Sequence, residues 1–232
     1  MRVTVKSGRG SEVGRRKIVR DGYDRIASQY AARRTADSED VQLLNLLVER
    51  LPPRAKVLDA GCGSGYPVSQ FLSQYFQITG VDFAEEQIRL AKTKLPDSTF
   101  VCSDLTRMPF KKDVFDALVS YYAIIHVPRQ EHSKLLVDFH RTLKTGGLAL
   151  LCLGAGDLPE DIADYLGTEM FWSHYDKETN LRMMKESGFD ILWYKVVEDP
   201  IDAPSAHLFV LAQKLGDPGR LSVTSARLLF GV

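Results

Sequence analysis

Three glycines within five residues mark the stretch best suited to holding a ligand. In VLDAGCGSG, residues 57–65, an apolar strand end is followed by Asp59 and by a turn that contains Gly61, Gly63 and Gly65. Glycine permits positive φ angles and lets the backbone come close to a bound molecule. Between a strand and a helix, such a turn lies at the carboxyl edge of an α/β sheet, where ligands of this architecture bind.

The turn matches neither of two phosphate-binding patterns. A dinucleotide fingerprint counted from Gly61 needs a glycine where the chain has Tyr66, and a phosphate loop needs a Lys followed by Ser or Thr, which is missing. A tight turn that holds no ligand is a second interpretation. What the other strands bring to the same edge decides between the two.

Polar residues follow the later strands as well, namely Asp82, Asp104, and Ser120 with Tyr121. The carboxyl ends of parallel strands share one edge, so these residues should converge on the glycine turn. Asp82 lies about 20 residues beyond Gly61, the spacing at which an acid hydrogen-bonds the hydroxyls of a ribose. A helix N-cap is the structural alternative for Asp82. The convergence favours a nucleoside-type ligand.

Alternating strands and helices must position these residues. Strands are predicted at 56–60, 77–82, 99–104, 115–121, 147–153, 189–198 and 205–214, with helices around 67–75, 84–95, 130–144 and 177–187. Apolar strands separated by helices indicate a mostly parallel sheet covered on both faces. The last two strands are joined by too short a connector for a crossover helix, so they should pair antiparallel. We expect an α/β, Rossmann-like, seven-stranded mostly parallel sheet with helices on both faces and one antiparallel strand near the C-terminus.

Both ends of the chain fall outside this alternation. Residues 1–18, rich in Arg and Lys with interspersed glycines, are typical of a flexible basic extension. A helix is predicted from Val19, and its Tyr23 and Tyr30 share a face that could cover a neighbouring site or simply pack. We therefore expect one domain at 19–214 with an N-terminal helical lid, a less regular stretch after Gly154, and a tail at 215–232 whose role the sequence leaves open.

Composition narrows the class of partner. The chain has 232 residues, 44% of them hydrophobic, and its 30 basic and 30 acidic residues cancel. A neutral chain gives no general attraction to nucleic acid or an anionic membrane, so a small molecule is the expected partner. Cys62, Cys102 and Cys152 are far apart, as in a reduced cytoplasmic protein, and no cluster has metal-ligand spacing. No apolar run is long enough for a membrane span or resembles a signal core, and we expect a monomer or homodimer.

Five segments then follow one another in a recognisable order: VLDAGCGSG, GVDFAEEQI, CSDLTRMPF, FDALVSYYAIIHV and LKTGGLALL. The series resembles the motifs of class I S-adenosylmethionine-dependent methyltransferases, and the likeness extends over most of residues 20–214. Within that class the chain is similar to small-molecule methyltransferases. The resemblance implies S-adenosylmethionine as cofactor, S-adenosylhomocysteine as product, and direct in-line methyl transfer to an acceptor that it does not identify.

The resemblance also implies roles at the methionyl end of the cofactor. Three residues of the turn would line the methionyl and ribose portion by backbone contact: Gly61, Cys62 and Gly63. Asp59 would orient the amino group through charge or water. Ser120 or Tyr121 would touch the methionyl part near the sulfonium, while Tyr23 and Tyr30 would cover the site.

Further roles are implied at the nucleoside end. Asp82 would hold the ribose hydroxyls, and Phe83 would pack on the adenine ring. Asp104 and the backbone of Leu105 would bind the adenine edge. Gln87 is either an adenine neighbour or a surface residue of the following helix.

Methyl transfer requires few catalytic side chains. The cofactor supplies the electrophile, so the protein must align the acceptor and exclude water. A base matters only when the nucleophile arrives protonated. His126, which follows the fourth strand, is the candidate base, although a histidine at this place can equally serve the fold. Tyr121 is a second candidate because of its place near the sulfonium.

A second aromatic patch is FWSHYD, residues 171–176. Trp172, His174 and Tyr175 could form an aromatic wall of the pocket with one titratable group, or they could pack beneath the start of a helix. Tyr122 could contact the substrate or face the core. We therefore treat His174 as a catalytic candidate and the three aromatic residues as substrate-binding candidates.

Other functions compete with methyl transfer. Aminopropyl transfer would use the same cofactor family, but the fourth strand is not followed by an acid-rich segment suited to a polyamine. Methylation of nucleic-acid amino groups is disfavoured because SYYAII stands where an Asn- or Asp-Pro-Pro-Tyr motif is usual. A catalytically silent domain that binds S-adenosylmethionine as a regulator or partner subunit is the remaining alternative.

Overall fold

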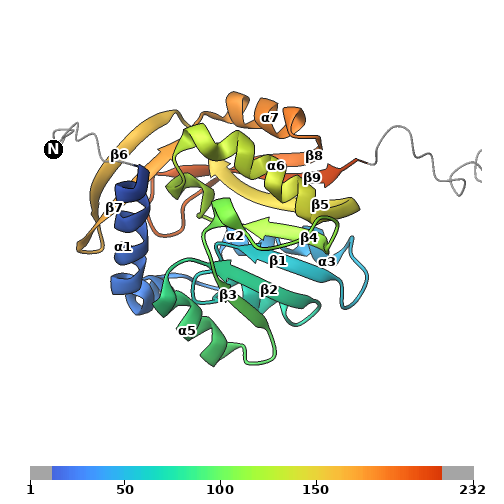
Figure 1. Ribbon diagram of the computed structural model, residues 1–232, viewed down its shortest axis with the longest axis horizontal. Helices are drawn as coiled ribbons and strands as arrows, with labels where there is room; N and C mark the ends of the chain where they lie inside the picture. The colour runs from blue at the N-terminus through green and yellow to red at the C-terminus, as the bar shows by residue number, and fades with distance from the viewer. Residues whose placement is uncertain (1–11, 216–232) are drawn as a thin grey trace, which may run out of the picture.

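The computed structural model describes residues 12–215, so most of the expected basic extension and nearly all of the tail lie outside the described residues. The main sheet consists of β1 (Lys56–Ala60), β2 (Gln77–Asp82), β3 (Thr99–Cys102), β4 (Phe115–Ser120), β5 (Leu143–Gly154), β8 (Phe189–Glu198) and β9 (Ala206–Lys214). Its order is β3-β2-β1-β4-β5-β9-β8 (Figure 1). All pairings are parallel except those of β9 with β5 and β8. The predicted seven-stranded sheet with one antiparallel strand is confirmed.

Helices cover both faces of this sheet. They are α2 (Glu39–Gln42), α3 (Asn45–Val48), α4 (Val68–Leu72), α5 (Glu85–Lys94), α6 (His132–Thr142) and α7 (Lys177–Glu186), with short 3₁₀ turns η1 (Leu105–Arg107), η2 (Ile124–His126) and η3 (Arg129–Glu131). Neighbouring strand residues pack to opposite sides: Val57 contacts the core under α2 to α4, and Leu58 the core under α6 and α7. Both are fully buried, as the apolar character of the strands predicted.

A helix and a hairpin form a cap beside the carboxyl edge of the sheet. The hairpin pairs β6 (Leu158–Tyr165) with β7 (Thr168–His174), and α1 (Glu12–Arg33) packs along β7 (Figure 1). The approach is close at Gly22, where a Cβ would lie 3.0 Å from the end of the Met170 side chain and 3.1 Å from the carbonyl oxygen of Glu169. We call α1 with this hairpin the cap.

The cap corrects two expectations from the sequence. The stretch after Gly154, expected to be irregular, is mostly hairpin, because β6 finds its partner in β7 rather than in the main sheet. The expected domain boundary at residue 18 falls inside α1, which begins at Glu12. The helix extends this far because Arg15 pairs with Glu160 of the hairpin and Arg16 with Asp104 beyond β3, contacts that local sequence cannot reveal.

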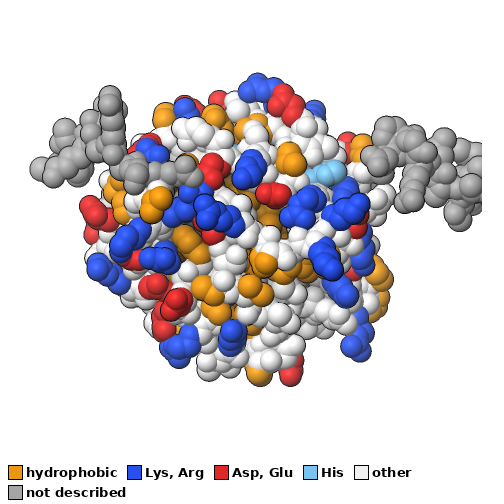
Figure 2. Space-filling model, viewed as in Figure 1, with side chains coloured by type: hydrophobic (Ala, Val, Ile, Leu, Met, Phe, Trp, Pro, Cys, Tyr) orange, Lys and Arg blue, Asp and Glu red, His pale blue; other side chains and the backbone are white. Residues whose placement is uncertain are grey.

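The surface carries charges of both signs. Figure 2 shows basic and acidic side chains spread over the face seen in Figure 1, with hydrophobic side chains between them. Among residues 12–215, no helix combines the length and the apolar character that a membrane crossing requires. In the same residues, no group of three or more His, Cys, Asp or Glu side chains is placed to hold a metal ion.

Candidate active site

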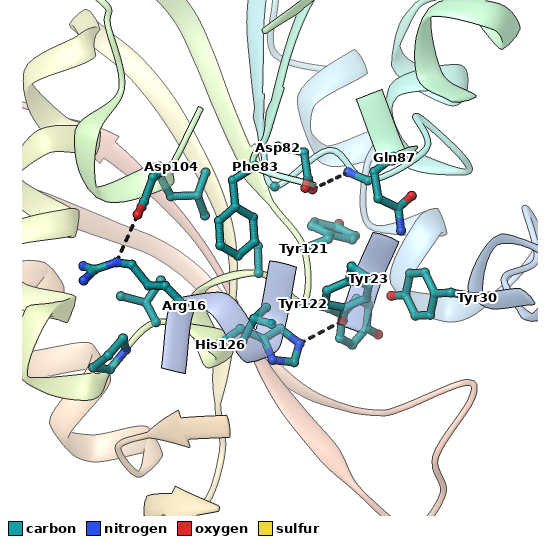
Figure 3. Close-up of a pocket in the computed structure, with 17 residues that line it drawn as sticks. Arg16, Tyr23, Tyr30, Asp82, Phe83, Gln87, Asp104, Tyr121, Tyr122 and His126 are labelled. Carbon is teal, nitrogen blue, oxygen red and sulfur yellow. Dashed lines mark hydrogen bonds and ion pairs between the residues drawn. The ribbon is translucent and has the colours of Figure 1, made fainter. Parts of the chain in front are cut away.

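A cavity lies between the sheet edge and helix α1 of the cap (Figure 3). Its lining comes from α1, from the ends of the first three strands, from Gln87 of α5, and from the segment after β4. The residues are Arg16, Val19, Tyr23, Tyr30; Gly61, Gly63, Asp82, Phe83, Asp104, Leu105; Gln87; Tyr121, Tyr122, Ala123, His126, Val127 and Pro128. Most of the residues selected from the sequence are thus brought together.

The glycine turn contributes a bare backbone surface to the cavity. The N–H groups of Gly61 and Cys62 both donate to one carbonyl oxygen of β2, and the N–H of Gly63 donates to Asp82 at 2.9 Å. These donors are used within the chain, so the turn offers a ligand room rather than hydrogen bonds from N–H groups. A Cβ on Gly61 would lie 2.1 Å from the Cβ of Ala123, and its φ of 84° is unfavourable for other residues.

Two acceptors lie beside this turn. Asp82 accepts N–H groups from Gly63 and from Ala84, each at 2.9 Å. Burial raises the pKa of Asp82 to about 6, although these backbone donors oppose the shift. Gln87 is 1% exposed, and its Oε1 has no hydrogen-bond partner among the described residues. A buried acceptor without a donor is unfavourable, so this end of the cavity fits a ligand that carries hydroxyl or amino groups.

Arg16, which the sequence analysis did not select, closes the other side of the nucleoside end. Its Nε lies 3.0 Å from Asp104, and its Nη2 pairs with Glu131 (Figure 3). The other oxygen of Asp104 accepts the N–H and the hydroxyl of Thr106, both at 2.8 Å. Arg16, Val19, Tyr23, Ile26 and Tyr30 recur at helical spacing, so extending the predicted stripe towards the N-terminus would have revealed Arg16.

Tyr23 and His126 form a hydrogen-bonded pair at the opposite end. The Tyr23 hydroxyl lies 2.9 Å from His126 Nε2, and Nδ1 lies 2.6 Å from the carbonyl oxygen of Phe171. Because a carbonyl only accepts, Nδ1 carries the proton and Nε2 accepts from the phenol. Burial lowers the pKa of His126 to about 4 and raises the pKa of Tyr23, so both are neutral at neutral pH.

A second, smaller cavity adjoins the first behind the glycine turn. The two share lining residues Tyr30, Gly61, Gly63, Tyr121 and Tyr122. Asp59, Cys62 and Arg34 line only the second. Asp59 is buried and accepts the hydroxyl of Ser69 at 2.6 Å, and burial raises its pKa to about 7.

Known proteins are similar to this chain in sequence and in fold. Residues 57–147 match the model of a methyltransferase domain family. The chain is 26% identical, over 65% of its length and 63% of the relative's, to an uncharacterised methyltransferase of Oceanobacillus iheyensis. It is 31% identical, over 61% of its length and 52% of the relative's, to malonyl-[acyl-carrier protein] O-methyltransferase of Laribacter hongkongensis.

A solved structure adds the spatial comparison. The 1,6-didemethyltoxoflavin-N1-methyltransferase of Burkholderia thailandensis, with bound 1,6-didemethyltoxoflavin and S-adenosylhomocysteine, has a TM-score of 0.72 to this chain. It is 18% identical, and the match covers 91% of this chain and 94% of that one. Residues 57–147 thus belong to a methyltransferase domain family, and the chain has the fold of class I S-adenosylmethionine-dependent methyltransferases. It spans less than two thirds of the length of the two curated relatives, so the likeness concerns a domain.

S-adenosylmethionine is the cofactor that such a domain implies, and the residues present fit it. The unpartnered Gln87 oxygen and the two-acceptor edge of Asp82 suit a nucleoside, and the bare surface at Gly61 leaves room for the chain that follows it. Phe83 and Leu105 supply apolar surface to the same cavity.

Two predicted cofactor contacts at the end of β4 do not lie as expected. Ser120 is fully buried, and its hydroxyl donates to the carbonyl oxygen of Ala60 at 2.7 Å, where it ties β4 to β1. The hydroxyl of Tyr121 donates to the backbone of Asp40 at 3.0 Å. Its ring still lines the cavity, but its polar atom serves the fold. Tyr121 therefore offers no free base.

Of the predicted substrate-binding and catalytic aromatic residues, some line a cavity and others do not. His174 and Tyr175 line neither cavity: His174 hydrogen-bonds the carbonyl oxygen of Gly156, and the Tyr175 ring lies beneath Arg129, with 4.7 Å from guanidinium to ring centroid. Trp172 stands one layer behind the wall, with its ring 5.7 Å from that of His126. Tyr122 does line both cavities, with an unusual φ of 54°. The patch was misplaced because the hairpin register, not the sequence spacing, decides which side chains face the cavity.

Proposed function

We propose that this methyltransferase transfers the methyl group of S-adenosylmethionine to a small-molecule acceptor with an aromatic or apolar body. The cavity wall around His126 carries the proposal. Tyr23, Tyr30, Tyr122 and Val127 line it with rings and apolar surface. The charged residues that line this cavity, Arg16, Asp82 and Asp104, belong to the nucleoside side. Such a wall favours an uncharged planar body over a charged one.

When bound, S-adenosylmethionine supplies a methyl carbon already activated by its sulfonium, and the electrons of the broken carbon–sulfur bond return to sulfur. The protein must hold the acceptor's nucleophilic atom in line behind that carbon and keep water away, an effect of roughly 7 to 11 kcal/mol when alignment is good. The rings of Tyr23 and Tyr122 would align the acceptor, and the cap would exclude water.

The hydrogen-bonded pair would remove a proton from an acceptor that arrives protonated. The proton of the acceptor passes to the Tyr23 oxygen, and at the same time the Tyr23 hydroxyl proton passes to Nε2 of His126. The carbonyl of Phe171 holds the ring in the tautomer that this transfer needs. Because burial lowers the pKa of His126 to about 4, it is a weak base. It would take the proton through Tyr23 only as the acceptor atom bonds to the methyl carbon and becomes acidic.

The named relatives favour methyl transfer over mere binding. The Burkholderia protein has 1,6-didemethyltoxoflavin and S-adenosylhomocysteine bound, and the curated relatives bear methyltransferase names. Support for a catalytically silent domain is missing from these comparisons.

A panel of aromatic and heterocyclic metabolites with hydroxyl or ring-nitrogen nucleophiles tests the proposal. We expect release of S-adenosylhomocysteine, measured by mass spectrometry, with a subset of these acceptors and a methylated product of matching mass. Carboxylic and polyamine acceptors serve as controls. Tight cofactor binding without turnover on any acceptor would favour the silent domain, and turnover confined to the charged controls would contradict the aromatic acceptor.

A further inference from the structure

Tyr122 lies in the cavity wall with a backbone conformation that its residue type disfavours. Its φ of 54° falls in the left-handed region, which is an outlier for a bulky side chain. Such a conformation persists only where the surrounding structure holds it, and it is found preferentially at functional sites. Because Tyr122 lines both cavities, the contacts that hold it also fix a wall of the candidate site (Figure 3).

Two sets of contacts hold the Tyr122 side chain. The first comes from the segment after α1, where Asp40 accepts the hydroxyl at 3.1 Å and the guanidinium of Arg34 lies 4.6 Å from the ring centre. The second comes from β9, where the His207 ring packs edge-on, with 5.1 Å between ring centroids and 88° between the planes. The Tyr122 ring is therefore held from two segments that are far apart in the sequence.

His207 is itself held by Asp199, the residue that follows β8. Its Nε2 lies 3.1 Å from Oδ2 of Asp199, and the other carboxylate oxygen accepts the N–H groups of Ile201 and Asp202. Burial would raise the pKa of Asp199, but the hydrogen bond from His207 and the backbone donors outweigh burial and lower this pKa. The carboxylate is therefore ionised at neutral pH and only accepts, so Nε2 carries a proton and donates it. The connector between β8 and β9 is thereby tied to the ring that packs on Tyr122.

Packing alone does not explain a histidine at this position. His207 is 8% exposed, and its Nδ1 has no hydrogen-bond partner among residues 12–215. A buried polar atom without a partner lowers stability, a loss that a phenylalanine would avoid. Residues 208–212, which follow in β9, are all buried and apolar. What the imidazole adds to this run is the hydrogen bond to Asp199, which sets the direction of its ring.

We propose that Asp199 and His207 are positioning residues for the acceptor and that they act through Tyr122. Neither residue lines either of the two cavities, so their effect must pass through the ring that lines both. With His207 fixed, the Tyr122 ring presents a constant face to the aromatic or apolar body of the acceptor. Without it, the disfavoured backbone can relax and the ring can turn. The inference rests on the proposed function and deepens it, because it names residues that set the affinity for the acceptor.

Steady-state kinetics with an acceptor from the metabolite panel test this role. His207→Phe keeps a ring in place but removes the bond to Asp199. The KM for the acceptor should rise about tenfold, because the ring that binds the acceptor is no longer fixed. Since Tyr23 and His126 are unchanged, kcat should stay within about threefold of wild type. His140→Phe is the matched control, since its ring also packs edge-on, 5.2 Å from the Phe189 ring, but lines neither cavity, and it should leave the KM unchanged.

A double variant shows whether His207 acts through Tyr122. In the background of Tyr122→Leu, His207→Phe should raise the KM no further, because the ring to be positioned is missing. If the two increases in KM multiply, or if His207→Phe alone has the KM of wild type, His207 only packs and the proposal is overturned.

Fluorine NMR follows the Tyr122 ring without an acceptor. In the full chain labelled with 3-fluorotyrosine, the signal that is lost in Tyr122→Phe identifies Tyr122. Asp199→Ala should broaden or split this signal, because a released His207 lets the Tyr122 ring adopt more than one orientation. Asp202→Ala, which removes an exposed carboxylate from the same connector, should not. An unchanged Tyr122 signal in Asp199→Ala would overturn the proposal.

The two measurements separate this proposal from the proposed function. A Tyr122 signal that responds to Asp199→Ala, without methyl transfer to any acceptor of the panel, would uphold the positioning of the ring and reject the proposed function. Methyl transfer with an unchanged KM in His207→Phe would uphold the proposed function and reject the positioning role.

Discussion

Asp82 and Tyr23 face the same cavity from opposite walls, yet different parts of the chain hold them in place. On the sheet wall, Asp82 is fixed by backbone N–H groups of Gly63 and Ala84, which belong to the strand ends themselves. On the cap wall, Tyr23 is held by the His126 side chain, and α1 as a whole meets the sheet edge through pairs such as Arg16 with Asp104.

The difference separates two tasks. Backbone contacts at parallel strand ends form with the sheet, so the cofactor wall is preorganised for binding. Side-chain pairs across the cavity can part and reform, as a wall that admits a ligand requires. Damage to the sheet wall should therefore appear in cofactor affinity, and damage to the cap wall in turnover or in exchange rates.

The largest effect should follow Tyr23→Phe, which keeps the ring and removes the hydroxyl that bonds Nε2 of His126. With a protonated acceptor from the metabolite panel, we expect kcat to fall about 100-fold, because the route for the proton is broken. Cofactor affinity by calorimetry should change little. His126 itself is a poorer target, since its bond to the Phe171 carbonyl also holds the hairpin.

If Tyr23 and His126 act together, their effects on kcat should not add up as those of two independent residues would. Tyr23→Phe/His126→Phe should be no slower than the slower single variant, because either change alone interrupts the same route. If the kcat losses of the two single variants multiplied in the double variant, proton transfer through Tyr23 to His126 would be contradicted. An unchanged kcat in Tyr23→Phe would mean that the cap wall only shapes the pocket.

A smaller loss should follow Asp82→Ala on the sheet wall. Because we propose that Asp82 accepts the ribose hydroxyls, its removal should weaken binding of S-adenosylhomocysteine by at least about tenfold in calorimetry. Turnover at saturating cofactor should fall less than in Tyr23→Phe. Asp97→Ala, an exposed carboxylate after α5, is the matched control. Unchanged affinity in Asp82→Ala would contradict the ribose assignment.

The same division explains what the sequence could reveal. The strands and the acids at their ends were predictable, because parallel topology alone brings Asp82 and Asp104 to the glycine turn. The register between β4 and β1 then decides where each side chain points. The Ser120 hydroxyl donates to the carbonyl oxygen of Ala60 and does not reach into the cavity. No pattern within one strand contains that information.

The cap was less predictable because its contacts link distant segments. Tyr23 and Tyr30 share a helical face in the sequence, but the partner of Tyr23 lies about 100 residues away in His126. The hairpin had no clear alternation, and so His174 was expected in the cavity that it does not reach. Arg15 and Arg16 resembled a solvated charge run until their acidic partners were known.

Those two arginines give the finest test of the comparison. Arg16 joins the cap to the sheet edge at Asp104, whereas Arg15 pairs with Glu160 inside the cap. Because the Arg16 pair is partly exposed, Arg16→Met should change the affinity for S-adenosylhomocysteine only about threefold. Association and dissociation, followed by stopped-flow fluorescence, should both become faster, since the wall parts more easily. Arg15→Met should leave both rates near those of wild type. If the two variants have the same rates, the Arg16–Asp104 pair between cap and sheet does not control ligand exchange. The two walls would then differ in the contacts that hold them but not in their function.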